Sequence, residues 1–217
     1  MRIPYVNLLK QYSEERKKLL AVIDKTLNTG QYVGGDEVNK FEKNIKSFLK
    51  EKHCIALNSG TDALTLGLHI LGVKKNDEVI TTPNSFIAST AVIIHLGAKP
   101  IFVDVKKDQC IDPKLIEKAI TKKTKAIMVV HLTGRVCEMD KINAISKKYK
   151  IPIIEDAAQA IGSKYNKKFA GTLGAIGCFS AHPLKNLNAL GDAGYLTTNS
   201  SKIAKFIRDV RNHGMTN

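Results

Sequence analysis

The sequence of 217 residues contains no tryptophan, only 6% aromatic residues and just four cysteines. The cysteines (Cys54, Cys110, Cys137 and Cys178) form no CxxC pair and lie in or beside apolar stretches, which indicates buried free thiols in a reducing compartment. The six histidines are dispersed, so no metal site is expected. No run approaches the roughly 18 to 20 apolar residues of a transmembrane helix, and residues 1–10 lack the apolar core of a signal peptide. We therefore expect a cytoplasmic protein with no membrane partner.

Arginine is also scarce, because only five of the 34 basic residues are arginine, although the formal net charge is +14. The lysines are scattered as short pairs, such as Lys74-Lys75 and Lys147-Lys148, on expected polar helix faces and turns. Proteins that bind nucleic acids usually concentrate charge on one element and read bases with arginine or aromatic side chains. The basic excess therefore predicts a solvated surface and no nucleic-acid partner.

What the sequence does contain is a regular alternation of helix and strand, with enough residues for one α/β domain. Two strands, at 126–130 and 151–154, are continuous apolar runs, which is typical of strands buried on both faces of a parallel sheet. Ser13 is a plausible N-cap for the first helix, and Gly30 follows its end. The predicted helices are 13–28, 36–50, 62–71, 85–96, 113–120, 140–148 and 201–211, and the predicted strands are 55–57, 78–82, 100–105, 126–131, 151–155, 176–180 and 195–198. We expect an α/β fold in which helices cover both faces of a mostly parallel central sheet.

Ligands of such sheets bind beyond the carboxyl ends of the strands, which directs attention to 58–61, 82–86, 155–159 and the segment after Phe179. Ser59-Gly60-Thr61 joins a strand to a helix, where a glycine and free backbone N–H groups suit a phosphate. The alternative is an ordinary helix cap. Asp156 follows the most apolar strand and is the candidate for a pocket carboxylate, because strand alternation sends Glu155 to the other side. The alternative for Asp156 is a carboxylate that caps a helix.

Lys185 differs from the other lysines in its setting. It follows a predicted strand, has apolar neighbours and precedes the small-residue turn Gly191-Asp192-Ala193-Gly194. An amine in a partly desolvated site loses proton affinity and becomes a usable nucleophile. A phosphate cradle, a buried carboxylate and such a lysine together describe the protein's share of a pyridoxal phosphate site.

Several motifs, which occur in a fixed order along the chain, make the sequence similar to one particular enzyme family. The chain resembles the DegT/DnrJ/EryC1/StrS sugar aminotransferases, within the fold-type I pyridoxal phosphate enzymes, and the motifs span nearly all of it. The matching stretches are Gly30-Gln31-Tyr32-Val33-Gly34-Gly35, Ser59-Gly60-Thr61-Asp62-Ala63-Leu64, Pro83-Asn84-Ser85-Phe86, Glu155-Asp156-Ala157-Ala158-Gln159, Phe179-Ser180 with Lys185-Asn186-Leu187, Gly191-Asp192-Ala193-Gly194 and Arg211-Asn212-His213-Gly214. The resemblance implies the three-layer α/β/α large domain of a fold-type I aminotransferase.

The resemblance also implies a role for each matching residue. Lys185 would be the catalytic residue, forming the Schiff base with pyridoxal 5'-phosphate and then moving a proton between substrate and cofactor. Asp156 would keep the pyridine nitrogen protonated, and Gln159 would lie near the phenolic oxygen. Phe86 would stack on the ring, unless it is a core aromatic. The phosphate would be held by Gly60, Thr61, Asp62 and Ser180.

The implied reaction moves an amino group from an amino donor, usually glutamate, to the keto carbon of a nucleotide-linked sugar. Such enzymes serve amino-sugar, surface-polysaccharide or antibiotic biosynthesis, and the implied assembly is a homodimer. Scattered lysines near the site would assist the capture of an anionic sugar nucleotide.

The implied domain organisation is an N-terminal arm and helix at 1–30 and an incomplete cofactor-binding large domain at 31–217, with the C-terminal small domain absent. Two alternatives remain: an inactive or regulatory truncated paralogue that pairs with a full-length subunit, and a related sugar dehydratase. In the dehydratases a histidine replaces the Schiff-base lysine, so Lys185 argues against the second alternative. The motifs do not specify the sugar, the aminated position or the stereochemistry.

Overall fold

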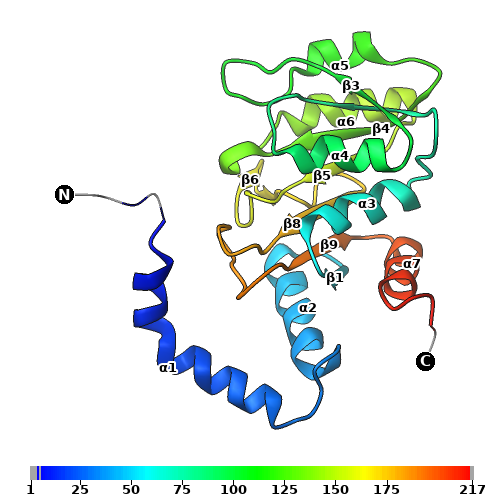
Figure 1. Ribbon diagram of the computed structural model, residues 1–217. Helices are drawn as coiled ribbons and strands as arrows, with labels where there is room; N and C mark the ends of the chain where they lie inside the picture. The colour runs from blue at the N-terminus through cyan, green and yellow to red at the C-terminus, as the bar shows by residue number, and fades with distance from the viewer. Residues whose placement is uncertain (1–3, 5, 216–217) are drawn as a thin grey trace.

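The computed structural model describes residue 4 and residues 6–215, so residues 1–3 and 5 of the expected N-terminal arm and residues 216–217 of the expected large domain lie outside it. Helices and strands alternate along the chain (Figure 1). The helices are α1 (Leu8–Leu27), α2 (Gly35–Leu49), α3 (Gly60–Ile70), α4 (Ile87–His95), α5 (Pro113–Ala119), α6 (Met139–Tyr149), α7 (Ser201–Arg211) and the short 3-10 helix η1 (Leu132–Gly134). The strands are β1 (His53–Leu57), β2 (Glu78–Thr81), β3 (Lys99–Phe102), β4 (Thr124–Val130), β5 (Ile153–Asp156), β6 (Lys164–Tyr165), β7 (Lys168–Phe169), β8 (Ile176–Ser180) and β9 (Gly194–Thr198).

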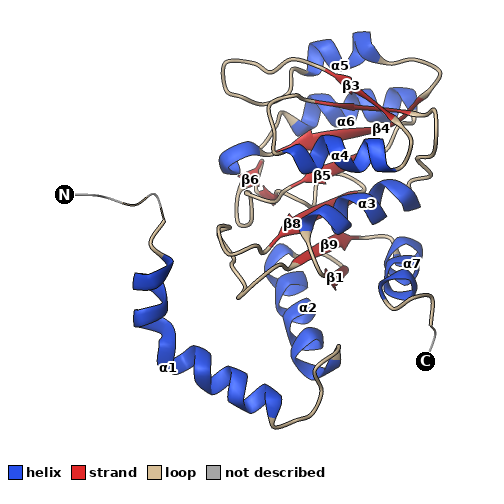
Figure 2. Ribbon diagram, viewed as in Figure 1, coloured by secondary structure: helices blue, strands red, loops and turns tan. Residues whose placement is uncertain are grey.

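Seven strands form one sheet in the order β1-β9-β8-β5-β4-β2-β3. The pairs β2–β3, β2–β4, β4–β5 and β5–β8 are parallel, whereas β9 runs antiparallel to both of its neighbours. Figure 2 shows these strands lying side by side between helices. The expected mostly parallel sheet is therefore confirmed, with β9 as the reversed strand.

The alternation of side chains along each strand explains the two covered faces. On one face, Met128 and Ile154 pack in a core with residues of α3, α4 and α7. On the opposite face, Val129 and Ile153 pack with residues of α5 and α6, while α2 covers the part of that face near Phe179. Helices on both faces of one sheet make the expected three-layer α/β/α arrangement.

The first helix begins earlier than predicted. Asn7, not Ser13, is its N-cap, and the Asn7 Oδ1 atom accepts a hydrogen bond from the Lys10 amide at 3.0 Å. Ser13 lies within the helix and donates its hydroxyl to the Lys10 carbonyl at 2.7 Å. The signal for Ser13 was ambiguous because serine bonds to backbone groups both at caps and inside helices. No residue of α1 is buried, and the helix extends away from the sheet (Figure 1).

A small antiparallel hairpin, β6–β7, was not predicted from the sequence. Each of its strands has only two residues, too few for a periodic pattern to show. The hairpin leads into the 170–174 turn, which returns the chain to the sheet at β8. Among the described residues, no helix is both long and apolar enough to cross a membrane.

Candidate active site

The carboxyl ends of β4, β5 and β8 open onto a cavity of about 480 Å³. Parallel strands end at the same edge of a sheet, so side chains that directly follow them meet there although they are far apart in sequence. Of the expected site residues, those that line this cavity are Gly60, Thr61, Phe86, Asp156, Gln159, Ser180 and Lys185. His131, His182, Asp192 and Ser85 also line it. The structure thus brings together all of the expected site residues except Asp62.

One end of the cavity is formed by the start of α3 against the end of β8. The Ser59 hydroxyl caps α3 by accepting the Asp62 amide at 3.0 Å. A Cβ atom on Gly60 would lie 2.8 Å from the Ser180 Cβ atom, and one on Gly194 would lie 2.2 Å from the Ser59 carbonyl carbon. Glycine is therefore required at both positions, because the backbone at the start of α3 lies against β8 at Gly60 and against β9 at Gly194. The helix N-terminus that results is suited to an anion.

Ser180 and Asp62 differ in whether they keep a hydrogen-bond donor available for a ligand. The Ser180 hydroxyl oxygen accepts the His182 amide at 3.2 Å, so the Ser180 proton remains available for donation into the cavity. The Asp62 amide is already committed to Ser59. Asp62 lines a second hollow of about 1320 Å³ beside α2, α3 and α7. Its expected part in phosphate binding therefore has no support in the geometry.

Asp156, at the end of β5, is only 6% exposed and faces the cavity. Its Oδ2 atom accepts a hydrogen bond from the Ser89 hydroxyl at 2.7 Å, and its Oδ1 atom accepts one from the Ala158 amide at 3.2 Å. Neither partner carries a charge. Burial of a carboxylate without a counter-charge is costly, so this part of the cavity favours a cationic or proton-bearing ligand atom.

Gln159 is held by the turn that follows β4. Its Oε1 atom accepts the Thr133 amide at 2.8 Å, and Thr133 adopts a left-handed conformation with φ of 55°. Because the oxygen is engaged, the amide nitrogen is the part of Gln159 that remains to donate to a ligand. The Phe86 ring at the start of α4 is 70% exposed, so the alternative of a core aromatic is wrong.

Lys185 lies on the connection between β8 and β9. A turn precedes it, in which the Lys185 amide donates to the His182 carbonyl at 2.8 Å and the Leu184 amide donates to His182 Nδ1 at 3.2 Å. The connection is tied back by a bond from the Ala181 amide to the Ala193 carbonyl at 2.8 Å. These bonds hold the connection at the edge of the sheet, where Lys185 lines the same cavity as Asp156.

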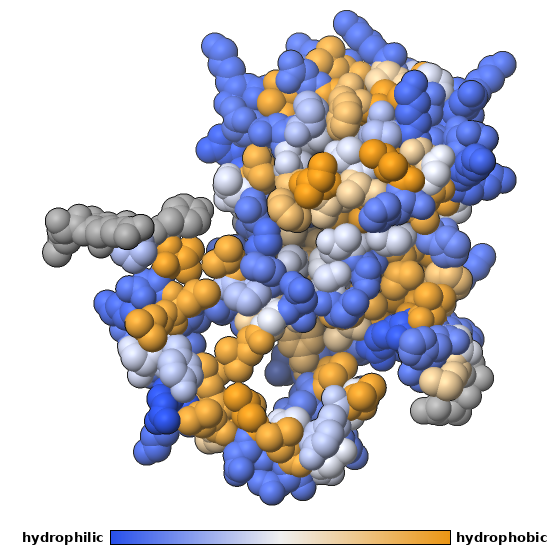
Figure 3. Space-filling model, viewed as in Figure 1, coloured by the Kyte–Doolittle hydropathy of each residue, from blue (hydrophilic) through white to orange (hydrophobic). Residues whose placement is uncertain are grey.

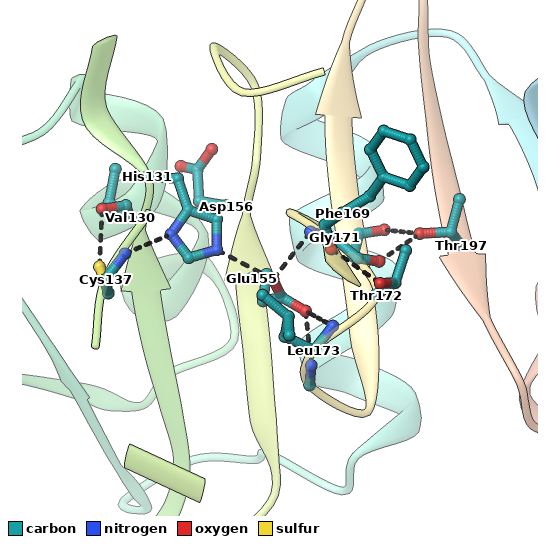
Figure 4. Close-up of polar contacts among 12 residues, drawn as sticks. Val130, His131, Cys137, Glu155, Asp156, Phe169, Gly171, Thr172, Leu173 and Thr197 are labelled. Carbon is teal, nitrogen blue, oxygen red and sulfur yellow. Dashed lines mark hydrogen bonds and ion pairs between the residues drawn. The ribbon is translucent and has the colours of Figure 1, made fainter. Parts of the chain in front are cut away.

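Glu155 points away from Asp156, to the opposite face of the sheet, as the alternation predicts (Figure 4). Its carboxylate is fully buried and accepts backbone N–H groups from Gly171 at 2.7 Å, Leu173 at 2.7 Å and Gly174 at 2.5 Å. It also contacts His131 Nε2 at 2.9 Å. Four donors therefore satisfy this buried carboxylate and fix the 170–174 turn to the central strand.

The hydrogen bonds around Glu155 and Cys137 also fix the tautomer of His131. The Cys137 amide points to His131 Nδ1 at 3.3 Å, so Nδ1 is the acceptor and Nε2 carries the proton that is donated to Glu155. Both ring nitrogens are thus occupied by protein groups, although His131 lines the cavity. His131 was not predicted as a site residue; the sequence signal for it was its place at the end of a continuous apolar strand.

The four cysteines are free and buried, as expected. Burial raises the pKa of the Cys54 and Cys178 thiols well above the ordinary value, so neither is a nucleophile. Within residues 4 and 6–215, no cluster of three or more histidine, cysteine or carboxylate side chains is arranged to hold a metal ion.

Comparison with known proteins agrees with this geometry. The chain is 41% identical over 213 residues to the UDP-2-acetamido-2-deoxy-3-oxo-D-glucuronate aminotransferase of Pseudomonas aeruginosa, an alignment covering 98% of the chain and 59% of the relative. The solved structure of DesV from S. venezuelae superposes with a TM-score of 0.96 at 37% identity, over 100% of the chain and 58% of DesV. NtdA from Bacillus subtilis, solved with its cofactor PMP, gives 0.88 at 37% identity, over 94% of the chain and 46% of NtdA.

The chain therefore spans between 46% and 59% of the length of these relatives. Residues 13–217 match the family model named for the DegT/DnrJ/EryC1/StrS aminotransferases. The ordered motifs, the fold and the cavity at the strand ends agree with that match, and the chain belongs to the DegT/DnrJ/EryC1/StrS aminotransferase family.

Proposed function

We propose that the protein acts as a pyridoxal phosphate-dependent aminotransferase, moving an amino group from an amino donor such as glutamate to the keto carbon of a nucleotide-linked sugar. The observation that carries the proposal is the convergence of Lys185, the buried Asp156 carboxylate and the start of α3 on one cavity. The relatives named above, which include an aminotransferase of a UDP-linked keto sugar, support the substrate class.

The cavity fits pyridoxal phosphate at three points. Asp156 offers a buried carboxylate whose partners are uncharged, which suits a protonated pyridine nitrogen. Gln159 offers an amide donor held by Thr133, which suits the phenolic oxygen. The N-terminus of α3 and the free Ser180 proton suit the phosphate. NtdA, which is solved with PMP, the amino form of the same cofactor, supports this assignment.

When bound, the cofactor supplies an aldehyde and an electron-withdrawing ring that stabilises charge on the substrate carbon. Lys185 would hold the cofactor through its Nζ atom, and the freed amine would then carry a proton to and from that carbon. Asp156 would keep the proton on the ring nitrogen. His131 does not take part in proton transfer, because Cys137 and Glu155 occupy its two nitrogens.

The proposal is tested by adding pyridoxal phosphate to the purified chain, reducing with borohydride and locating the modified lysine by peptide mass. We expect one modified residue, Lys185, and no modification in Lys185→Ala. The exposed Lys147, on α6, gives a matched control, because Lys147→Ala should leave the modification of Lys185 unchanged. A chain whose absorption spectrum does not change on addition of the cofactor contradicts the proposal. Amino transfer from glutamate to a keto-sugar nucleotide is the further assay of activity.

We further propose that the protein works as a homodimer whose α1 helix packs against the second copy. Apolar side chains lie along much of α1 (Figure 3), and those of Leu9, Val22 and Leu27 are 79%, 60% and 54% exposed. A helix with such a stripe is stable in water only when another surface covers the stripe. Phe86 and Leu184, which line the cavity, are also exposed large hydrophobic residues. The four free cysteines are consistent with a reducing compartment such as the cytoplasm.

A further inference from the structure

Ser89, in the first turn of α4, is a fully buried polar residue beneath the cavity. Its Oγ atom lies 2.7 Å from Asp156 Oδ2 and 2.7 Å from Ser85 Oγ. Ser85 itself lines the cavity, next to Phe86. A chain of two hydroxyl groups therefore runs from the loop that carries Phe86 to the carboxylate at the end of β5.

The direction of the hydrogen bonds follows from the chemistry of the groups. An ionised carboxylate can only accept, so the Ser89 hydroxyl donates its proton to Asp156. The Ser89 oxygen is then free to accept, and Ser85 is the donor in the second bond. Ser89 has one proton, and that proton is committed to Asp156.

We propose that Ser89 is a positioning residue that sets the orientation of the Asp156 carboxylate toward the ring nitrogen of the cofactor, and that Ser85 holds Ser89 in place. This inference rests on the proposed function. Asp156 is fixed at both oxygens, by Ser89 at Oδ2 and by the Ala158 amide at Oδ1. The amide belongs to the backbone two residues away, so Ser89 is the side chain among these contacts whose removal frees the carboxylate to turn.

The orientation matters because a hydrogen bond to a charged group weakens steeply when it is misaligned. A carboxylate that must first be ordered by its ligand binds that ligand less tightly than one held in place beforehand. Ser89→Ala removes the hydroxyl and keeps the helix, since alanine has the higher helix propensity. We expect Ser89→Ala to weaken binding of pyridoxal phosphate about tenfold, in line with loss of one hydrogen bond to a charged group.

The test compares pyridoxal phosphate with its analogue in which the ring nitrogen is replaced by C–H. Dissociation constants are measured by absorbance titration of the unsubstituted chain, Ser89→Ala and a control, Ser146→Ala. Ser146 is a partly buried serine of α6 whose hydroxyl donates to the Ile151 carbonyl at 2.6 Å, outside the cavity. We expect Ser89→Ala to weaken the natural cofactor and to leave the affinity for the analogue unchanged, because the analogue has no ring nitrogen for Asp156 to meet. Ser146→Ala should change neither.

Two outcomes overturn the inference while the proposed function stands: unchanged affinity of Ser89→Ala for pyridoxal phosphate, or equal loss for cofactor and analogue, which would show a structural effect alone. An unsubstituted chain that binds no pyridoxal phosphate overturns the proposed function and the inference with it. A second arm uses Asp156→Asn, in which the effect of Ser89→Ala should disappear. A persisting tenfold effect in the Asp156→Asn background shows that Ser89 acts elsewhere and contradicts the proposal. Thermal unfolding of each variant without cofactor identifies any loss of fold.

Discussion

The substitution Glu155→Gln tests whether the Glu155 carboxylate stabilises the fold, in contrast to the neighbouring Asp156 carboxylate, which faces the cavity. Glu155 Oε1 accepts the Leu173 and Gly174 amides, and Oε2 accepts the Gly171 amide and His131 Nε2. Glutamine keeps the shape of the side chain but replaces one oxygen with an NH₂ group. Each oxygen accepts two N–H groups, so replacing either oxygen with NH₂ leaves two N–H donors without an acceptor and pointing at another donor. Water does not reach the site to replace the lost acceptor, because the side chain is fully buried.

The expected loss in the free energy of unfolding follows from the number of hydrogen bonds to Glu155 that the substitution removes. A hydrogen bond to a charged acceptor contributes about 1.5 to 3 kcal/mol, so two lost bonds correspond to about 3 to 6 kcal/mol. His131 could take the other tautomer and accept from the new NH₂ group, but its Nδ1–H would then oppose the Cys137 amide. A chain of this size loses about 2 to 4 °C of midpoint temperature per kcal/mol, so we expect a fall of about 6 to 24 °C.

The assay is thermal unfolding followed by circular dichroism, with Glu117→Gln as the matched control. The Glu117 side chain is 41% exposed and contacts Lys148 Nζ at 2.6 Å and the Tyr149 hydroxyl at 3.0 Å. Exposed pairs contribute little, so the midpoint of the control should change only slightly. Hydrogen exchange at the Gly171 and Leu173 amides should accelerate in Glu155→Gln. Equal midpoints for the two variants would refute the role given to Glu155.

Three further predictions concern other parts of the chain. Gly194→Ala should lower the midpoint of thermal unfolding and weaken cofactor binding, because the new Cβ atom would overlap the Ser59 carbonyl carbon; an unchanged midpoint and affinity would contradict this. Burial raises the pKa of Glu51 from 4.5 to about 7, so the folded chain binds a proton more tightly than the unfolded chain. The free energy of unfolding should therefore fall as pH rises from about 4.5 to about 7, and Glu51→Gln, which keeps an acceptor for Asn199, should remove this part of the pH dependence in denaturant titrations. Val22→Asp places a charge on the exposed apolar face of α1 and should convert the proposed dimer to a folded monomer in sedimentation velocity; a dimer that persists would place the interface elsewhere.

Much of the site could be predicted because strand ends are local features. The continuous apolar runs of β4 and β5 indicate a buried parallel sheet, and the residues after such strands meet at one edge. The period of two along a strand assigns Asp156 and Glu155 to opposite faces, and the structure shows them there (Figure 4). Asp62 is the expected site residue that does not line the cavity, and a motif, which specifies neighbours in sequence, does not reveal that its amide bonds to the Ser59 cap.

The sequence by itself determined the order of the α-helices and of the seven strands of the main sheet, the two-faced burial of the central strands, the motifs of the family and the side of the sheet on which Asp156 lies. Only the tertiary structure decided which distant groups complete each buried carboxylate. Ser89 reaches Asp156 across 67 residues, and the 170–174 turn and His131 reach Glu155 across 16 to 24 residues. The physical reason is that periodicity reports which face a side chain occupies, whereas a hydrogen bond depends on where separate segments of chain lie in space.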